Sequence, residues 1–277
     1  SKFNIKDYYT HPLTYLVSEI IECFFDLRDH CCICNSKLPF TVIKPAICDK
    51  KLCEVGFNEI GVGTSVIQEI KRDTNSADLL FSLFACSFQN PRYMDPKPPE
   101  HLVDWAPKAF KILPPMATIA KCYQSDSQII QKFGKDTLDL LRWVLLSNKS
   151  QLIHLPNELQ ISSIGFNNQF MTLLASPEKE LAFQKKKKRK GKSIFLWHGS
   201  SGDRWHSIIR NGLLNMSNRD CVHGAVHGEG IYLAQSSDIS LSYVNSSLNL
   251  YKNSPFFVKL IELLPDSNDL HFVYTKL

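Results

Sequence analysis

The chain has no hydrophobic run long enough to cross a membrane. The best candidate, residues 13–25, is broken by Glu19 and Glu22, whereas a spanning helix needs ~18 or more consecutive apolar residues. The chain also starts at Ser1, without a methionine or a basic-then-apolar leader. That start predicts a fragment or a processed chain, so any targeting segment would lie outside this sequence. Together these absences predict a soluble protein without a membrane partner.

An excess of basic charge is confined to one segment. The 277 residues carry a formal net charge of +5, but residues 185–190 (KKKKRK) hold six cations and the rest of the chain comes to −1. This lack of general basicity argues against a nucleic-acid partner. Because no aromatic residue interrupts the run, we expect a solvated, mobile loop there. A nuclear-address or nucleic-acid-binding segment is the alternative.

The cysteines are unsuited to a disulfide framework. There are nine, an odd number, and five of them fall between residues 31 and 53. Such clustering favours a reducing compartment and a metal site over a set of disulfides. We therefore expect an intracellular protein, in the cytoplasm rather than the nucleus.

The clustered cysteines form two close pairs. Cys31 and Cys34 are separated by two residues, and Cys48 and Cys53 by four. Two such pairs supply the four soft ligands of a tetrahedral zinc, and four thiolates leave no open position for water. The spacing predicts a structural zinc site, with Cys32 as an alternative first ligand. The competing interpretation is a set of buried thiols that act as small hydrophobic side chains.

Two kinds of periodicity divide the chain near residue 156. Helical patterns cover residues 12–25, 76–88 and 136–147, with a proline-rich loop after the second. Beyond residue 160 the apolar segments are short and separated by turn residues, which is typical of a sheet. These strands are expected at 170–175, 193–197, 230–234, 256–264 and 270–274. We predict an α+β protein with a mostly helical, cysteine-rich region at 1–156 and a sheet domain at 157–277.

One helix is expected within the sheet domain, between the second and third strands. Ser201 or Asp203 would cap its start, and Asn211-Gly212 would end it. Its buried face would carry Trp205, Ile208 and Ile209.

The residues best suited to ligand binding or catalysis follow the strand expected to end at Trp197. His198-Gly199-Ser200 comes first, and Tyr232, Ser240 and Tyr243 follow at a distance. Each piece alone has a structural explanation, since such a tripeptide suits a strand-end turn and a strand aromatic is usually in the core. Their order predicts a clamp in which two tyrosines hold a flat heteroaromatic ring while the histidine fixes the attached sugars. That is a nicotinamide pocket without a Rossmann loop.

Residues 197–243 (WHGSSGDRWHSIIRNGL … HGEGIYLAQSSDISLSY) resemble the catalytic domain of the poly(ADP-ribose) polymerase superfamily, the diphtheria-toxin-like ADP-ribosyltransferases. The segments LPFTVIKPAICDKKLC, LDLLRWVLLSNKSQLIHLP and WHSIIRNGL resemble the mono-ADP-ribosyltransferase branch typified by the sixth and eighth human members. The likeness covers most of the chain. It implies a split antiparallel β-sheet for the C-terminal domain and NAD as the substrate.

The resemblance also implies roles for single residues. His198 would hydrogen-bond the 2′-hydroxyl of the adenine-side ribose. Gly199, with Ser200 beside it, would hold the nicotinamide carboxamide through its backbone, and the hydroxyl of Ser240 would bind the same amide. Tyr243 would form the floor on which the ring stacks.

Tyr232 would line the opposite side of the ring, near the nicotinamide ribose, again by resemblance. The loop from Asn215 to Glu229 corresponds to the donor loop that covers NAD. Within it, Cys221, His223 and His227 offer an alternative metal cluster. A mobile lid is a poor preorganised metal site, which favours the donor-loop interpretation.

The chain departs from the chain-forming members of the family at one catalytic position. Those enzymes place a glutamate shortly before a Tyr/Phe-Ile/Val-Tyr run, and aligning Val273-Tyr274 with that run puts Leu270 in its place. The catalytic set is then His198, Tyr232 and Leu270. Leucine cannot hydrogen-bond the ribose 2″-hydroxyl, so single transfer is expected and elongation is not. A one-residue slip that turned Asp269 or His271 inward is the alternative.

The sequence as a whole predicts an NAD-dependent protein mono-ADP-ribosyltransferase that releases nicotinamide. Its partners would be protein acceptors, the chain itself among the candidates. One alternative is a module that binds NAD or ADP-ribose without transfer, which the missing glutamate favours. Another is a zinc-containing nucleic-acid-binding protein built on the cysteine pairs and the lysine run.

Overall fold

The structure is a computed structural model of the whole chain. The residues that it describes are 9–26, 29–39, 46–48, 50–60, 65–148, 150–162, 168–174, 177–191, 196–216, 228–244 and 250–255. They divide into two compact units. Unit 1 comprises Ser1–Gly63 and Leu174–Lys190, and unit 2 comprises Thr64–Leu173 and Gly191–Leu277. This division differs from the boundary at residue 156 that the sequence suggests, which stays a prediction.

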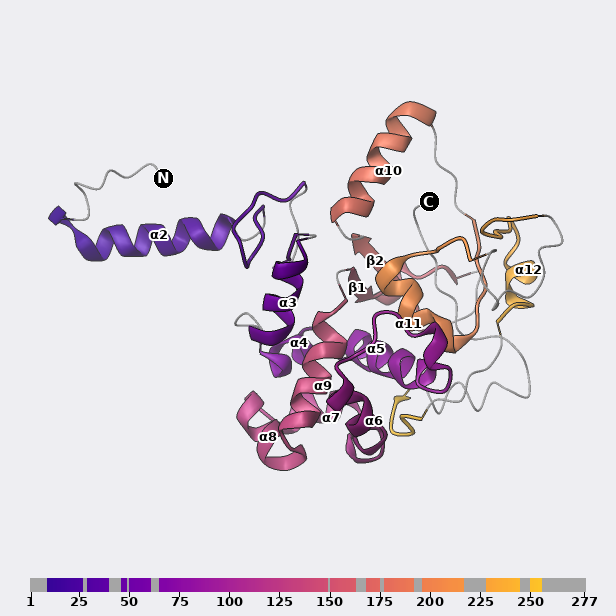
Figure 1. Cartoon of the computed structure of the whole chain (residues 1–277), viewed down its shortest axis with the longest axis horizontal. Coiled ribbons are helices and arrows are strands. Elements are labelled where there is room, and N and C mark those ends of the chain that lie inside the picture. Colours follow the sequence, from indigo (N-terminus) through magenta and orange to yellow (C-terminus); the bar gives the residue numbers. More distant parts are fainter. Residues whose placement is uncertain are drawn as a thin grey trace. The chain divides into compact units, whose positions relative to one another are not determined.

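Unit 1 contains the helices α2 (Pro12–Asp26), α3 (Lys51–Ile60) and α10 (Pro177–Lys190). Helix α2 is the element expected at residues 12–25, and Figure 1 shows it as one uninterrupted helix. Its apolar side chains are largely exposed, Leu13 at 77% and Ile20 at 66%. None of the described helices is long and apolar enough to pass through a bilayer.

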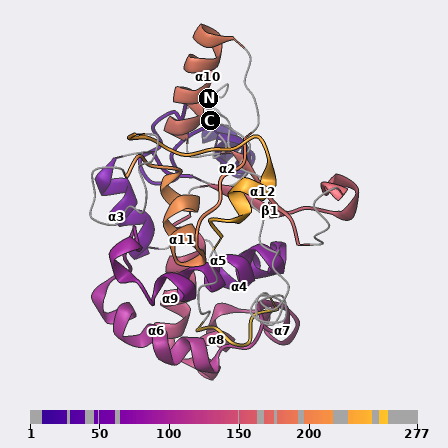
Figure 2. The ribbon, with the colours of Figure 1, turned by 90° about the vertical axis from the view of Figure 1, so that its right-hand side faces the viewer.

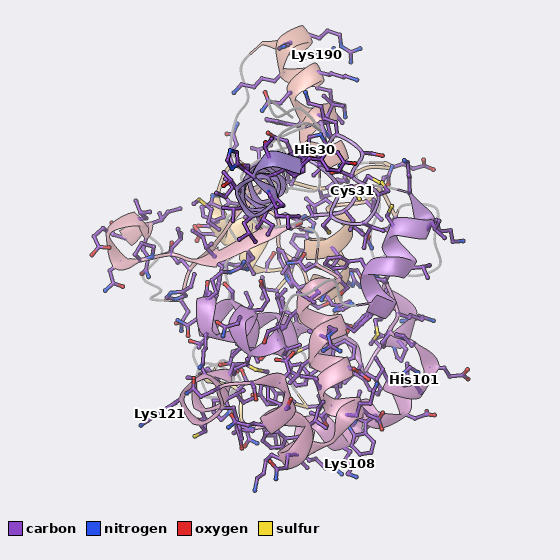
Figure 3. The ribbon with its side chains drawn as sticks, turned by 90° about the vertical axis from the view of Figure 1, so that its left-hand side faces the viewer. His30, Cys31, His101, Lys108, Lys121 and Lys190 are labelled. Carbon is purple, nitrogen blue, oxygen red and sulfur yellow. The ribbon has the colours of Figure 1, made fainter. Side chains whose placement is uncertain are left out.

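The lysine run forms the second half of helix α10, so the prediction of a loop at residues 185–190 was wrong. Lysine and arginine are good helix formers, and Pro177 is a favourable first residue. Four cations, Lys187 to Lys190, lie in the last turn, where they complement the helix dipole. All six cations remain exposed to solvent, and Figure 3 shows Lys190 projecting from the end of the helix.

Six helices build the core of unit 2. They are α4 (Val66–Arg72), α5 (Thr74–Ser87), α6 (Glu100–Ile112), α7 (Met116–Cys122), α8 (Asp126–Phe133) and α9 (Lys135–Leu146), with a 3₁₀ turn at Pro91–Tyr93. Helix α5 is central, because every residue from Ser76 to Ser87 is buried. Its aromatic side chains make edge contacts at centroid distances of 5.7 Å (Phe81 to Phe110) and 5.6 Å (Phe84 to Trp143). Helices α5 and α9 confirm the patterns expected at residues 76–88 and 136–147.

The sheet of unit 2 is small in the described part of the chain. Strands β1 (Gln151–His154) and β2 (Phe170–Leu174) form an antiparallel pair, and a 3₁₀ turn at Asn157–Leu159 follows β1. Strand β2 confirms the segment expected at 170–175. The strands expected at 256–264 and 270–274 lie outside the described residues, as does most of the one expected at 193–197. The prediction of a strand at 230–234 was wrong, because these residues form only a single bridge, at Ala234. The split sheet that the resemblance implies therefore stays a prediction, while the α+β class holds.

Helix α11 (Gly202–Asn211) packs along α5, as Figures 1 and 2 show from two directions. It begins after Ser201 and ends at Gly212, whose φ of 75° is readily adopted by glycine. The helix expected in the sheet domain is thus confirmed. Trp205 and Ile209 are buried as expected, whereas Ile208 is half-buried. A short helix, α12 (Ser237–Leu241), follows further along the chain.

Candidate functional site

The two motif segments meet through backbone hydrogen bonds. Trp197 and Ala234 form an isolated antiparallel bridge, in which each amide donates to the other residue's carbonyl at 2.8 and 2.9 Å. This bridge brings His198 beside Tyr232, although the two residues are 34 positions apart in the chain. The convergence expected from the order of the motifs is therefore present for these segments.

The imidazole of His198 is oriented by a main-chain carbonyl. Its Nδ1 lies 3.0 Å from the carbonyl oxygen of Tyr232. Because a carbonyl oxygen only accepts, Nδ1 carries the proton, and in the neutral ring the lone pair is on Nε2. The ring is half-buried, so it combines a fixed orientation with access to solvent. This arrangement suits a histidine that receives a hydrogen bond from a hydroxyl group.

Gly199 touches the backbone of α12. A Cβ atom built on Gly199 would lie 1.7 Å from the carbonyl oxygen of Ser240 and 2.7 Å from its carbonyl carbon. No side chain fits at this position unless one of the two backbones moves. Ser240 is itself buried at 8% exposure, in a helix whose first turn is capped by Ser236, which accepts from the amide of Asp238 at 3.3 Å. Gly199 and Ser240 are thus held against each other.

Ser200 is buried and is tied to helix α11. The indole Nε1 of Trp205 donates to the carbonyl oxygen of Ser200 at 3.2 Å. At the start of the same helix, the amide of Asn90 donates to the carboxylate of Asp203 at 3.2 Å. The position of the His198–Ser200 turn therefore depends on where α11 lies.

A buried cation holds the other end of α11, and sequence analysis did not find it. The guanidinium of Arg210 donates to the carbonyl of Val144 at 2.6 Å, to the carbonyl of His206 at 3.2 Å and to the hydroxyl of Ser147 at 3.2 Å. Burial lowers the pKa of Arg210 to about 9, so the group stays charged at neutral pH. The sequence feature that could have indicated a buried Arg210 is its position four residues after His206, next to the apolar Ile209.

His206 is fully buried and anchors α11 on another side. Its Nε2 lies 3.1 Å from the carbonyl of Pro96, and its ring stacks on Trp143 at a centroid distance of 5.7 Å. Burial, followed by the neighbouring charge of Arg210, lowers the pKa of His206 well below its usual value. A neutral ring that donates to Pro96 fits this environment.

The two tyrosines of the predicted clamp are both exposed. Tyr232 is 37% exposed and its hydroxyl donates to the carbonyl of Gly228 at 2.6 Å, while Tyr243 is 60% exposed. Neither ring is buried in a hydrophobic core, which is the arrangement that would have excluded a clamp. Their stacking on a ligand stays a prediction. Leu270 lies outside the described residues, as do Cys221, His223 and His227.

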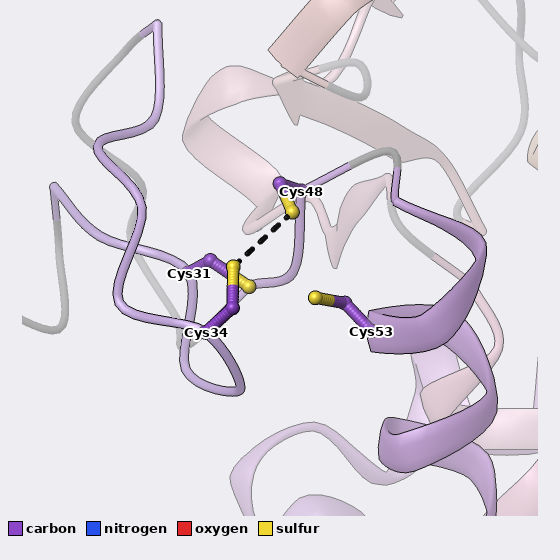
Figure 4. A group of neighbouring side chains, drawn as sticks. All are labelled: Cys31, Cys34, Cys48 and Cys53. Carbon is purple, nitrogen blue, oxygen red and sulfur yellow. Dashed lines mark hydrogen bonds between the residues drawn. The ribbon is translucent and has the colours of Figure 1, made fainter.

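The four cysteines predicted as metal ligands come together in unit 1. Their sulfur atoms all lie within 4.8 Å of one another, and Figure 4 shows them facing a common centre. The Sγ of Cys34 lies 3.2 Å from the hydroxyl oxygen of Ser36, and the hydrogen bonds of Ser36 lower the pKa of Cys34 to about 6. Burial instead raises the pKa of Cys32 to about 11. The group Cys31, Cys34, Cys48 and Cys53 could hold a metal ion.

Comparison with known proteins gives two matches. Residues 171–260 match the family model described as the poly(ADP-ribose) polymerase catalytic domain. The chain is also 33% identical over 241 residues to the protein mono-ADP-ribosyltransferase PARP8 of Mus musculus and to that of Homo sapiens. The alignment covers 78% of this chain but 28% of each relative, so the chain spans less than a third of their length. Residues 171–260 are thus similar to the poly(ADP-ribose) polymerase catalytic domain, and the relatives that the chain resembles over most of its length are mono-ADP-ribosyltransferases.

Proposed function

We propose that the chain is an NAD-dependent protein mono-ADP-ribosyltransferase that transfers one ADP-ribose unit per acceptor site and releases nicotinamide. The observation that carries the proposal is the meeting of His198 with Tyr232 and of Gly199 with Ser240. Four residues from three segments of the chain thus meet, in the combination that the family resemblance implies for an NAD site.

His198 would bind the sugar at the adenine end. With Nδ1 donating to Tyr232, its Nε2 is left to accept from the 2′-hydroxyl of the ribose. The carbonyl of Tyr232 therefore fixes both the ring orientation and the tautomer. A proton on Nε2 would reverse this preference, since imidazolium only donates.

The nicotinamide carboxamide would bind beside the point where Gly199 contacts Ser240. A planar amide needs a donor and an acceptor in fixed positions, and the main chain of Gly199 offers both. The hydroxyl of Ser240 would add a third hydrogen bond. Ser200 continues the turn, and its carbonyl is already held by Trp205. The turn is therefore positioned before NAD arrives.

The two exposed tyrosines would hold the ring of the leaving group. Offset stacking of aromatic rings stabilises a pair by about 0.5–1.5 kcal/mol beyond the area that it buries. Tyr243 would lie beneath the ring and Tyr232 beside the nicotinamide ribose. Binding of this kind keeps the departing ring in line with the bond that breaks.

In the reaction, the bond between the ribose C1″ and the nicotinamide nitrogen breaks with its electron pair going to nicotinamide. A nucleophilic side chain of the acceptor protein forms the new bond to C1″, and the proton of that side chain leaves to solvent. Positive charge develops on the ribose during this step. With Leu270 at the position of the family's glutamate, no carboxylate from that position stabilises the charge or activates a ribose hydroxyl for elongation.

Each unit would bind one non-protein group. NAD would be the substrate of unit 2, and its acceptors would be proteins, including the chain itself. Zinc would be the ion of the cysteine group in unit 1. Four thiolates complete its coordination, so the ion would have no part in the transfer.

Intact-mass spectrometry after incubation with NAD tests the proposal. One or a few discrete ADP-ribose adducts on the chain or on an added acceptor are expected, and His198→Ala should abolish them. A ladder of additions on one site would contradict single transfer. Absence of adducts from the native chain, with NAD binding retained in calorimetry, would favour the alternative of a binding module without activity.

A further inference from the structure

The first cysteine pair sits in a tight hairpin of unit 1. The amide of Cys31 donates to the carbonyl of Ser36 at 2.8 Å, and the amide of Asn35 donates to the carbonyl of Cys31 at 2.9 Å. Asn35 has a φ of 53°, a left-handed conformation that asparagine tolerates better than most residues. His30 and Lys37 close the hairpin as an antiparallel bridge. This turn places the side chains of Cys31 and Cys34 on the same side.

The second pair comes from the segment that enters helix α3. Cys53 is the third residue of that helix, and its amide donates to the carbonyl of Lys50 at 2.9 Å. The hairpin and the helix also touch, because a Cβ atom on Gly56 would lie 3.5 Å from the Cγ2 atom of Ile33. The two ligand pairs are thus held by one packed arrangement.

The sulfur positions match a tetrahedral ion. Zinc–sulfur bonds of ~2.3 Å at tetrahedral angles require sulfur atoms ~3.8 Å apart. Cys34 and Cys48 have their sulfur atoms 3.7 Å apart, and the whole group lies within 4.8 Å. Disulfide-bonded sulfurs would be ~2.05 Å apart, and these cysteines are free. We propose that Cys31, Cys34, Cys48 and Cys53 bind one structural zinc, with Cys32 excluded and Lys50 as the neighbouring counter-charge.

Cys32 is excluded by its backbone. Its amide donates to the carbonyl of Ala46 at 3.0 Å, whereas the amide of Cys31 takes part in the hairpin turn. The amides of these two neighbours therefore point to different carbonyls, that of Ser36 for Cys31 and that of Ala46 for Cys32. Cys32 is accordingly absent from the group of converging sulfurs, although it is adjacent to Cys31 in sequence. The geometry therefore selects one of the two candidate first ligands.

Charge balance explains the position of Lys50. Coordination of Zn²⁺ by four thiolates leaves a centre with a net charge of −2. The Nζ atom of Lys50 lies 3.8 Å from the sulfur of Cys34 and 2.9 Å from the hydroxyl oxygen of Ser36. Such neighbours typically change metal affinity by about 10–100-fold. Lys51, the next residue, is exposed and provides a matched control.

The core of unit 1 is small, and a bound metal ion would stabilise it. In the described part of that unit the buried apolar side chains are Cys31, Leu38, Ile47, Cys53 and Phe57. Two of these five are proposed ligands. Small units with few buried side chains commonly rely on a metal or disulfides for stability. The zinc would therefore fix the hairpin to α3, and this inference does not depend on the proposed transfer activity.

Metal analysis of the purified full chain tests the proposal without any use of NAD. Mass spectrometry of metals is expected to find ~1 zinc per chain, as for one tetrahedral site. Cys32→Ser should keep the ion, whereas Cys31→Ser should lose it. Replacement of zinc by Co²⁺ should give the absorption of a tetrahedral tetrathiolate. Lys50→Ala should weaken zinc retention against a chelator by about tenfold, and Lys51→Ala should not.

A second measurement keeps the test valid if Cys31→Ser fails to fold. Titration of the native chain with an organomercurial should release one zinc as the four ligand thiols react, in addition to exposed thiols such as that of Cys122. The proposal is overturned by a chain without metal, by iron in place of zinc, or by loss of zinc from Cys32→Ser with retention in Cys31→Ser. Failure of the transfer proposal would leave all of these readouts unchanged.

Discussion

Replacement of Gly199 by alanine is the most direct perturbation of the proposed NAD site. The added Cβ atom would lie 1.7 Å from the carbonyl oxygen of Ser240, whereas ordinary contact begins at 3.4 Å. The obstacle is backbone rather than a flexible side chain. The two segments must therefore separate by roughly 1.7 Å, the difference between these two distances. This movement pulls Gly199 away from the residue that would complete the amide site.

The size of the effect follows from that displacement. A misplacement of about 1 Å in a reacting geometry costs on the order of 100-fold in rate, which corresponds to about 2.7 kcal/mol of activation free energy. We therefore expect Gly199→Ala to lower the rate of ADP-ribose incorporation by about 100-fold or more. The assay is intact-mass spectrometry over time, at saturating and limiting NAD, with a melting curve to confirm folding.

Gly230→Ala is the matched control. Nothing lies within 4 Å of a Cβ atom at Gly230, although this glycine is also close to the motif in sequence. The control should therefore incorporate ADP-ribose at the native rate. Native activity in Gly199→Ala, or an equal loss in both variants, would refute the reasoning that the contact of Gly199 with Ser240 builds the site.

Three further predictions concern other residues. Burial raises the pKa of Asp78 from 3.8 to about 7, so the folded chain retains a proton that the unfolded chain releases above pH ~4. This stabilising contribution is fully present below pH ~4 and is lost as the pH rises to ~7. Asp78→Asn should therefore flatten the dependence of the urea midpoint on pH between ~4 and ~7. An unchanged slope in this variant would argue against the raised pKa of Asp78. Arg210→Met leaves the carbonyl of Val144 without its donor and should lower the unfolding free energy by about 2 kcal/mol, measured by urea denaturation; native stability would contradict the role of this cation. His271→Ala should leave ADP-ribose incorporation intact, and a large loss would indicate the one-residue slip in the strand expected at 270–274.

Helices with a clear apolar stripe could be predicted from the sequence. The residues at which they begin and end are set by capping residues. Helix α5 starts at Thr74 rather than Ser76, because the carboxylate of Asp73 accepts from the amide of Ser76 at 2.9 Å and caps the preceding turn. The end of α11 at Gly212 was predicted correctly, since glycine adopts the positive φ found there. Local chemistry of this kind can be read from a few residues.

Shorter helices were not predicted individually. Helix α6 contains Pro107, and α7 has seven residues and follows Pro114 and Pro115. Prolines within a helical pattern favour a loop interpretation. Their apolar faces are nevertheless buried against α5 and α9, and this packing outweighs the local preference. The lysine run shows the opposite case, because its helix-forming propensity prevailed where like charges in sequence suggested a loop.

The convergence of His198 with Tyr232 was predictable because both residues belong to recognisable motifs, and the four sulfurs of the cysteine group were predictable from their spacing. The side chains that hold the site in place, Trp205 and Arg210, could not be predicted in this way. Trp205 reaches back to Ser200 over a short distance in sequence, but the partners of Arg210 lie near residue 144. No local pattern encodes a pairing over that separation. A buried guanidinium with carbonyl acceptors is found only once the fold brings them together.

The contacts that hold helix α11 also indicate where the catalytic region of unit 2 begins. The carbonyls that hold Arg210 and His206 belong to Val144 and Pro96, and both precede residue 156. A domain starting at 157 would keep α11 but would lack these acceptors, exposing the guanidinium and releasing the helix that carries Trp205. Since Trp205 donates to Ser200, the turn with His198 and Gly199 would lose its support. The part of unit 2 that precedes residue 157 therefore helps to position the proposed NAD site, although it contains none of the proposed NAD-binding residues.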